Sequence, residues 1–382
     1  MDALAESNVK LDERIREVIG RVSPVQRFQQ LDNEKRFDHD LRAALTEEGV
    51  WRLGVSETYG GSGGSCVDQM VVLRALGNLA TSMGMFAVVQ FLCTRILGRN
   101  ATPEQRQSYL TPLLNGEATA SFCLTEREGG TDILRVMSTS AKKSEQEYVI
   151  NGEKAWICGA TMADFFIVVA RTGDGKTDGV SMFVVPADAP GVTARRIETF
   201  AINAYEVCDV KFDNVRVTTN NLLGEEGKGF RQLLSMLNAE RLNVSANALG
   251  MAQGAIQLAA LHASSRSAFG KTLSEFQAVQ HKLANAALSY ELAWNYLIAA
   301  AKASDRSEPI DVVSSMCKLA AVNAAQLAAD VGMETMGASA FEVRSPMQRY
   351  YRDYRLYVIA PLNNDMSRSL IAERYFNFKR GF

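Results

Sequence analysis

The stretch Ser121–Asp132, SFCLTEREGGTD, lies where the pattern of the chain changes. Up to about residue 118, apolar residues recur at three- and four-residue steps, as in HDLRAALTEEGVW, and this period predicts helices. From about 119 to 226, short runs rich in Val, Ile and Phe, such as FFIVVART, are separated by Gly, Asp and Pro turns, which predicts strands. The stretch therefore opens a β-domain, a barrel or sandwich, inserted between helical regions.

Beyond residue 227 the helical period returns in longer runs. Segments such as EFQAVQHKLANAALSYELAWNYLIAAAKAS are rich in Ala and Leu, which predicts a bundle of antiparallel helices. We therefore predict an α+β fold with an N-terminal helical domain over 1–118, a β-domain over 119–226 and a C-terminal helical bundle over 227–382. The bundle helices carry more apolar positions than one buried face needs, which predicts an oligomer interface.

The composition narrows the classes of partner. Lys plus Arg number 41 and Asp plus Glu 43, for a formal net charge of −2, so no basic surface for nucleic acid is expected. The six cysteines form no CxxC pair and the three histidines are far apart in sequence, which argues against a disulfide frame and a metal centre. Apolar runs are interrupted before membrane-spanning length, and the polar N-terminus lacks a secretory pattern, so we expect a cytoplasmic protein.

Three short segments are candidates for ligand contacts. The Gly-Gly-Thr turn at 129–131 frees backbone N–H groups for a ligand, although alone it is more simply a surface turn. Trp156, in WICGA, ends a β-run and is either ordinary core or a flat wall for an aromatic ring. Arg266–Lys271, RSAFGK, ends a helix; its Arg and Phe are suited to a pyrophosphate and an adenine, or the segment is a plain capped turn.

In this order and on this architecture, the segments resemble the acyl-CoA dehydrogenase family of flavoproteins. TEREGGTD is similar to the family's T-E-x-x-x-G-[ST]-D signature, WICGA to its W-I-[ST]-[NG] segment, and RSAFGK with FQAVQHKLA to its R-x-x-F-G…Q segment. The resemblance covers essentially the whole chain. It implies a helical N-terminal region, a β-domain and a C-terminal four-helix bundle, assembled as a homodimer or homotetramer. It also implies FAD, with the flavin between the β-domain and the bundle.

The resemblance carries cofactor contacts onto particular positions. These are Phe122, Leu124, Thr125, Thr131, Trp156, Cys158, Arg266, Phe269, Gln277, Glu334, Gly337, Ala338, Asn363 and Asp365. The residues from 266 to 277 are expected to reach across a dimer interface, and those from 334 to 338 to close over the cofactor from a neighbouring subunit. Cys158 stands where the family has Ser or Thr, Glu334 where it has Gln, and Ala338 where it has Gly.

The expected catalytic base is displaced. The family's usual glutamate, in a loop after the Arg352-Asp353 pair, is here Pro361, which has no proton-accepting side chain. Some members carry the base instead on a bundle helix in a segment like L-x-x-E-R, and Leu237–Leu242, LNAERL, matches it. A Glu-Arg pair on a helix is more often solvated, but Glu240 is the remaining motif-matched carboxylate, with Asp365 as its rival.

The resemblance then implies α,β-dehydrogenation of an acyl-CoA or acyl-carrier-protein thioester, in which Glu240 takes the α-proton and the β-hydride passes to flavin N5. Asn238 and Arg241 are candidates for contacting the carrier part of the substrate. Met85 and Phe86 are candidates for the acyl pocket, and their bulk favours a short, branched or cyclic group, although such a stripe is more often core.

Two other functions fit the same residues. One is a biosynthetic oxidase or oxygenase in which reduced flavin meets oxygen, favoured modestly by Cys158 and the altered 361–365 loop. The other is a non-catalytic subunit of a mixed oligomer, which the retention of Thr125, Trp156 and Arg266 argues against. The electron acceptor is therefore either an electron-transfer flavoprotein or oxygen.

Overall fold

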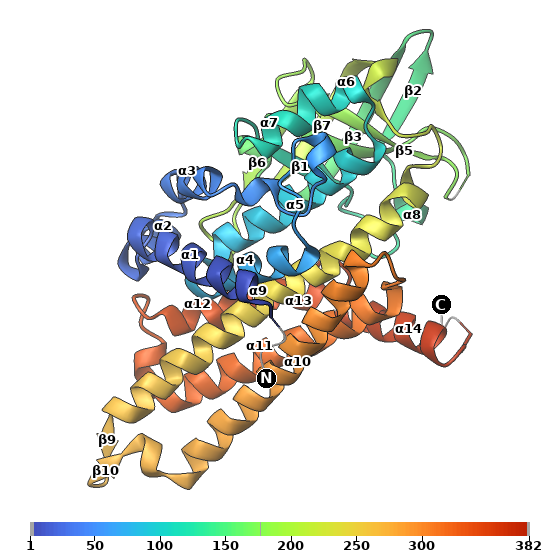
Figure 1. Ribbon diagram of the computed structural model, residues 1–382. Helices are drawn as coiled ribbons and strands as arrows, with labels where there is room; N and C mark the ends of the chain where they lie inside the picture. The colour runs from blue at the N-terminus through green and yellow to red at the C-terminus, as the bar shows by residue number, and fades with distance from the viewer. Residues whose placement is uncertain (1–3, 176, 380–382) are drawn as a thin grey trace.

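The computed structural model describes residues 4–175 and 177–379 and has three regions that follow one another along the chain (Figure 1). The N-terminal helices pack beside the β-domain, and three long helices extend away from both. This arrangement confirms the predicted fold of a helical region, a β-domain and a helical bundle.

The elements have the following bounds. The N-terminal region contains α1 (Glu6–Val22), α2 (Val25–Glu34), α3 (His39–Glu47), α4 (Cys66–Leu79), α5 (Thr81–Asn100), α6 (Pro103–Gln105) and α7 (Thr111–Leu114). The β-domain contains β1 (Ala120–Cys123), α8 (Ile133–Val136), β2 (Ser140–Ser144), β3 (Glu147–Cys158), β4 (Phe165–Arg171), β5 (Val180–Pro186), β6 (Val192–Ile197), β7 (Val207–Thr218) and β8 (Leu222–Leu223). The bundle contains α9 (Gly229–Ser265), β9 (Ser267–Ala268), β10 (Lys271–Thr272), α10 (Gln277–Asp305), α11 (Asp311–Met336), α12 (Pro346–Asp353), α13 (Arg355–Ile359) and α14 (Asn364–Tyr375).

The sheet of the β-domain has the strand order β6-β7-β3-β2-β4-β5-β8, with β1 pairing parallel to β4. Strand β4 shows why its sequence is continuously apolar. Alternate residues of a strand point to opposite faces: Phe166, Val168 and Ala170 pack in the core of the β-domain, whereas Phe165, Ile167 and Val169 pack in the core shared with the helices. Both faces of β4 are therefore buried.

Helix α5 is buried on all sides. Every residue from 81 to 94 lies in the interior, so no polar face marks its orientation. Contrary to the expectation from sequence, α5 and the 311–340 segment are long and apolar enough to cross a membrane by length and composition. In this fold 89% of the apolar window of α5 and 56% of that of the second segment are buried within the protein, and the core helix of a globular domain meets the same criterion.

Helix α9 crosses the N-terminal helices at very short range. A Cβ added at Gly77 of α4 would lie 2.1 Å from the backbone oxygen of Asn247, and one at Gly84 of α5 would lie 2.3 Å from the Asn247 side-chain oxygen. Real Cβ atoms do not approach so closely, so the crossing requires glycine at both positions. It places the middle of α9 directly against α4 and α5.

A buried polar cluster joins all three regions. Asp353, at the end of α12, accepts hydrogen bonds from the Thr81 hydroxyl (3.0 Å), from the backbone N–H of Ile202 (2.9 Å) and from Arg352 (2.9 Å). Arg352 also pairs with the buried Asp32 of α2 at 2.8 Å. The cluster anchors the 198–205 loop, which forms part of the site described below.

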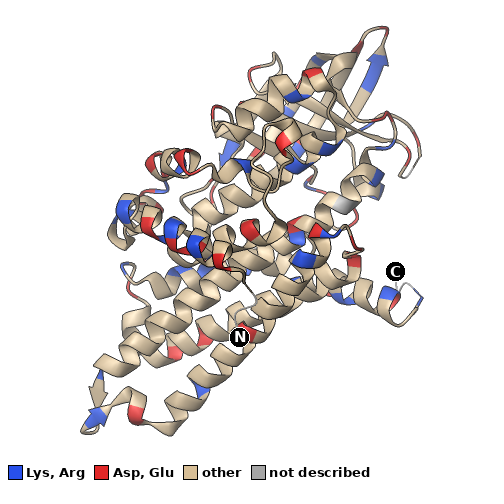
Figure 2. Cartoon of the chain, in the orientation of Figure 1, with Lys and Arg blue, Asp and Glu red and all other residues tan. Residues whose placement is uncertain are grey.

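Charged residues are unevenly distributed over the surface. Figure 2 shows mixed acidic and basic residues along α1 and α2, whereas the long helices of the bundle carry few charges along their length. Several apolar side chains of the bundle are exposed, including Leu288 and Leu292 of α10. Exposed apolar side chains that lie close together are commonly buried in the interface between subunits.

Candidate functional site

A cavity of about 930 Å³ lies where the β-domain meets α5, α9 and the segment from α13 to α14. The β-domain contributes one wall, from the ends of β1 and β3 and from the 198–207 segment. The helices contribute a second wall, and residues 359–363 also line the cavity. Its size is in the range of small-molecule sites, and most of its lining is apolar.

The β-domain wall presents a flat apolar surface. Phe122, Leu124 and Thr125 line it from the end of β1, and Trp156 and Cys158 from the end of β3. Trp156 is 47% exposed and has a φ of +57°, which is uncommon for a bulky residue. The sheet register shifts between Lys154 and Ile157, and this bulge turns the indole outward.

A buried ion pair that sequence reasoning missed supports this wall. Lys154 is fully buried, and its ammonium donates to the Leu124 carbonyl and to the Glu126 carboxylate, each at 3.0 Å. Glu126 also accepts from the N–H and hydroxyl of Ser138 and from the N–H of Thr139, at 2.7–3.0 Å. Burial alone would raise the pKa of Glu126, but Lys154 and these donors lower it to about 2. The only sequence signal was two charges flanking apolar β-runs.

Glu240 lies on the helical wall, in the first third of α9. Among the residues that the structure describes, no hydrogen bond or ion pair at contact distance engages its carboxylate. Burial raises the pKa of Glu240 from 4.5 to about 7, because the surrounding apolar groups disfavour its charged form. The neighbouring Arg241 acts in the opposite direction and offsets part of that effect. A carboxyl group with such a pKa is suited to proton transfer near neutral pH.

Arg241 also lines the cavity and is 91% buried. Its guanidinium donates to the Asn238 side chain at 2.6 Å and to the Ser314 hydroxyl at 3.4 Å, while its Nε has no partner among the described residues. Asn238 does not reach the cavity and instead holds Arg241. The guanidinium therefore lines the cavity as a buried cation held by Asn238 and Ser314.

The loop that follows α13 is held from two sides. It contains a cis Ala360–Pro361 peptide, and Pro361, Leu362 and Asn363 line the cavity. The buried Lys318 of α11 donates to the Leu362 carbonyl and to the Asn364 side chain, both at 2.7 Å. Burial lowers the pKa of Lys318 to about 8. A single lysine within the apolar run MCKLAA was the signal for this contact.

Asn363 connects this loop to the β-domain, since its amide donates to the Thr131 hydroxyl at 2.9 Å. Asp365, the rival to Glu240, is exposed and pairs with Arg368 at 2.8 Å, and it does not line the cavity. The geometry therefore favours Glu240 over Asp365 as the group that faces a ligand.

Helix α5 turns Met85, Val89 and Leu92 toward the cavity. Phe86 points away from it and packs edge-on against Trp51 and Tyr205, with ring centres 5.3 and 5.6 Å apart. Met85 and Phe86 are adjacent and both buried, so the helical period alone could not separate them.

The remaining predicted cofactor residues lie at the other end of the bundle. Figure 1 shows the β9–β10 hairpin far from the β-domain. Arg266 and Gln277 are exposed there, and Phe269 is 96% exposed with a φ of +53°. Glu334 is paired with Lys282 at 2.5 Å, and Gly337 and Ala338 follow on the exposed end of α11. One chain therefore does not bring these residues to its own cavity.

The residues around the cavity fit the flavin half of FAD. Trp156, Phe122 and Leu124 offer apolar surface to a planar ring, and the hydroxyls of Thr125 and Thr131 offer hydrogen bonds to its polar edge. The basic and aromatic residues suited to the adenosine diphosphate half are those of the remote hairpin. The cavity of one chain therefore offers contacts for the flavin half alone.

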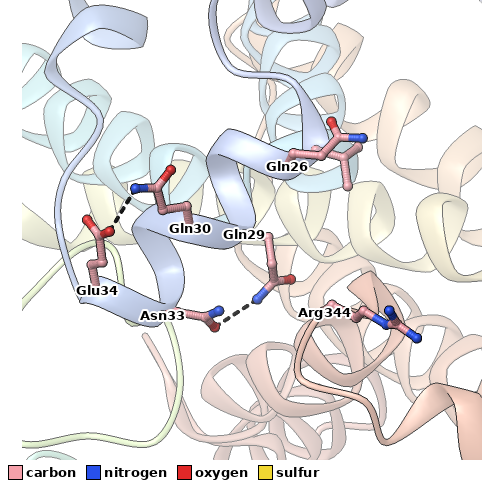
Figure 3. Close-up of a pocket in the computed structure, with 7 residues that line it drawn as sticks. Gln26, Gln29, Gln30, Asn33, Glu34 and Arg344 are labelled. Atoms are coloured by element: carbon pink, nitrogen blue, oxygen red, sulfur yellow. Dashed lines mark hydrogen bonds between the residues drawn. The ribbon is translucent and has the colours of Figure 1, made fainter.

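Two other features were considered as sites. Among the described residues, no group of three His, Cys, Asp or Glu side chains is placed to hold a metal ion. A second pocket, on α2, is lined mainly by amide side chains that pair along the helix, Gln29 with Asn33 at 2.9 Å and Gln30 with Glu34 at 2.8 Å (Figure 3). The ionisable groups in this pocket are Glu34 and Arg344, and the carboxylate of Glu34 is already engaged by Gln30 and by Arg36 at 2.9 Å.

Known proteins match the chain over nearly its whole length. Three family profiles match in sequence: acyl-CoA dehydrogenase N-terminal domain at residues 6–117, middle domain at 121–215 and C-terminal domain at 227–376. The probable acyl-CoA dehydrogenase YngJ of Bacillus subtilis is 34% identical over 90% of this chain and 91% of its own.

Solved structures agree with these profiles. Butyryl-CoA dehydrogenase of Megasphaera elsdenii superimposes with a TM-score of 0.94 at 26% identity, over 98% of this chain and all of the other. The prolyl acyl carrier protein oxidase AnaB superimposes with a TM-score of 0.93 at 25% identity, over 98% of this chain and all of the other.

Proposed function

The chain belongs to the acyl-CoA dehydrogenase family of FAD-dependent oxidoreductases, and from that premise we propose that it α,β-dehydrogenates an acyl thioester with Glu240 as the base. The similar proteins named above as acyl-CoA and butyryl-CoA dehydrogenases support this reaction class. CoA is the proposed carrier, and an acyl carrier protein is the alternative.

The observation that carries the proposal is the position of Glu240. It is an unpaired carboxylate of α9 that lines the same cavity as Trp156 and Leu124 of the β-domain. An acyl group held between the two walls would present its α-carbon to Glu240. With a pKa of about 7, the carboxylate is available at neutral pH and basic enough to take a proton.

The residues of this chain then have separate tasks. Glu240 removes the α-proton, and the mostly apolar lining of the cavity limits the water around the developing negative charge. Phe122, Leu124 and Trp156 would hold the flavin ring, and the bound FAD supplies the acceptor for the β-hydride. Arg241, whose guanidinium lines the cavity, would bind the polar part of the carrier. Pro361 has no backbone N–H to donate to the thioester carbonyl. The backbone N–H of Glu240 lies within α9, where it is used in the hydrogen bonds of the helix.

Anaerobic reduction of the yellow holoenzyme by acyl-CoA thioesters tests the base. Glu240→Gln should retain FAD and lose bleaching by several orders of magnitude, because glutamine cannot accept the proton. Asp365→Asn is the matched control and should bleach at the wild-type rate. Loss of bleaching in Asp365→Asn together with its survival in Glu240→Gln would refute the assignment.

A second candidate is an oxidase on the same fold. Cys158 lines the cavity at the end of β3, and its burial keeps the thiol protonated. One of the similar structures, AnaB, is a prolyl acyl carrier protein oxidase. Rapid reoxidation of the substrate-reduced enzyme by air would favour this candidate. Slow reoxidation by air and fast reoxidation by an electron-transfer flavoprotein would favour the dehydrogenase.

The proposed assembly is a homodimer or homotetramer, because the hairpin residues Arg266 and Phe269 lie too far from their own cavity to serve it. The exposed apolar side chains of α10 and the sparse charges of the bundle in Figure 2 support such an interface. All six cysteines are free thiols, in keeping with a reducing cytoplasm as the proposed location.

A further inference from the structure

The opening of the cavity is marked by residues that line it and are also exposed to solvent. Ile359 of α13 is 67% exposed and Phe200 is 71% exposed, and Arg355 is exposed as well. Arg355 and Ile359 are four residues apart in α13 and therefore lie on the same face of the helix. The backbone N–H of Ile202 donates to Asp353 at 2.9 Å, which holds the loop of Phe200 beside the start of α13. Arg355 therefore lies at the rim of the cavity.

The positive charge of Arg355 is not balanced by a neighbouring side chain. Among the residues that the structure describes, no carboxylate lies within ion-pair distance of its guanidinium and no hydrogen bond engages it. Glu198, which also lines the cavity, is paired with Lys35. Arg241, another cation of the lining, is buried, whereas Arg355 is exposed. Arg355 therefore presents a positive charge to any ligand that passes through the opening.

Two tyrosine rings hold the Arg355 guanidinium in place. Its Cζ lies 5.0 Å from the centre of the Tyr354 ring and 5.8 Å from that of the Tyr351 ring. The two rings meet edge to face with their centres 6.4 Å apart, and Tyr354 is fully buried. A cation within about 6 Å of an aromatic ring is attracted to it without using an N–H donor. The donors of the guanidinium are therefore positioned but remain free of protein acceptors.

Phosphate is the ligand chemistry that this arrangement suits. The parallel N–H donors of a guanidinium match the oxygens of a phosphate, with which they form two charge-assisted hydrogen bonds. In CoA and in an acyl carrier protein alike, the pantetheine arm that bears the acyl thioester ends in a phosphate. With the acyl group inside the cavity beside Glu240, the arm of the carrier must leave through the opening.

We propose that Arg355 binds the pantetheine phosphate of the thioester's carrier at the rim of the cavity. This inference rests on the proposed function and adds a carrier-binding residue that no motif of the sequence indicated. The apolar side chains of Phe200 and Ile359 would contact the pantetheine chain on its way to Arg355.

The test measures the binding of three thioethers: S-butyl-CoA, S-butyl phosphopantetheine and S-butyl pantetheine. Each lacks the carbonyl that acidifies the α-proton, so none can be dehydrogenated, and only the last lacks a phosphate. In calorimetric titrations of the holoenzyme, Arg355→Gln should weaken the binding of the first two by about tenfold, since a hydrogen bond to a charged group contributes on that scale. Its affinity for S-butyl pantetheine should equal that of the wild type.

Arg368→Gln is the matched control, because Arg368 is an exposed arginine of α14 that pairs with Asp365 and does not line the cavity. Its affinities for all three thioethers should stay at the wild-type values. An equal loss for S-butyl pantetheine in Arg355→Gln would overturn the proposal, because the effect would not depend on the phosphate. Unchanged binding of all three, or a loss confined to S-butyl-CoA, would overturn it as well.

Two further measurements separate this inference from the proposed dehydrogenation and from cofactor binding. Thioether binding needs no reaction, so a phosphate-dependent effect supports the inference even if acyl-CoA thioesters fail to bleach the flavin. Flavin absorbance should show that Arg355→Gln retains FAD, and loss of FAD would assign Arg355 to the cofactor and overturn the inference. An acyl carrier protein bearing the S-butyl phosphopantetheine arm should show the same loss in Arg355→Gln, and the carrier that binds the wild type more tightly is then the substrate.

Discussion

Replacing Glu240 with glutamine should stabilise the protein at alkaline pH and leave its stability unchanged at mildly acidic pH. In the unfolded chain this carboxyl group loses its proton near pH 4.5, whereas in the folded protein it does so near pH 7. Between these values the folded protein binds more protons than the unfolded chain, so the free energy of unfolding falls as the pH rises. Above pH 7 Glu240 is ionised in both the folded and the unfolded state, and the full cost of burying its charge then lowers the free energy of unfolding.

The size of the penalty follows from the raised pKa. From 4.5 to about 7, at roughly 1.4 kcal/mol per pKa unit, the ionised Glu240 costs about 3 kcal/mol of folding free energy. Glutamine has the shape of the protonated acid and no charge, so it removes the penalty without leaving a void. For a chain of 382 residues, whose unfolding entropy is roughly 0.8 kcal/mol per kelvin, the gain corresponds to roughly 4 °C in unfolding midpoint.

The assay is thermal unfolding of the holoenzyme, followed by flavin fluorescence at pH 5 and pH 8.5. Glu240→Gln should match the wild type at the lower pH and unfold several degrees higher at the upper one. Asp365→Asn, an exposed carboxylate paired with Arg368, is the control and should show no such dependence on pH. A Glu240→Gln variant with the same offset at both pH values would refute the reasoning, because Glu240 would then be solvated.

Further predictions concern the wall, the helix crossing and the cofactor. Lys154→Met should cost about 3–5 kcal/mol of unfolding free energy, because it leaves Glu126 buried and unpaired. Since the pKa of Glu126 is lowered from 4.5 to about 2, the contribution of this pair to wild-type stability should be lost as the pH falls across that range in an acid titration. Gly84→Ala should lower the unfolding midpoint, since its methyl group would lie 2.3 Å from a buried amide oxygen, whereas Gly98→Ala in the same helix meets nothing within 4 Å and should not destabilise. Phe269→Ala should lose FAD on gel filtration while keeping the wild-type circular dichroism, because the side chain is 96% exposed in one chain.

The long elements could be predicted from sequence because their burial is periodic. The buried residues of α10 recur at three- and four-residue steps, and those of β7 alternate, as the periods of a helix and a strand require. Helix α5 shows where this reasoning ends. It is buried on every side, so its sequence does not distinguish Met85, which faces the cavity, from Phe86, which does not.

The polar contacts that shape the site could not be predicted, because they join residues far apart in the chain. Lys154 and Glu126 are 28 residues apart, and Lys318 holds a loop 44–46 residues away. Each charge was visible in the sequence, but its partner depends on the tertiary fold. The motif-matched residues divide between the cavity and the remote hairpin, a division that the resemblance implied and that no periodicity of the sequence indicates.

The role of Glu240 as the base is tested most directly by exchange of the substrate α-proton. The holoenzyme would be incubated anaerobically in D₂O with a saturated acyl-CoA, and deuterium at the α-carbon would be followed by NMR. We predict exchange with the wild type and with Asp365→Asn, and none above background with Glu240→Gln. Exchange by Glu240→Gln at the wild-type rate would show that another group removes the proton.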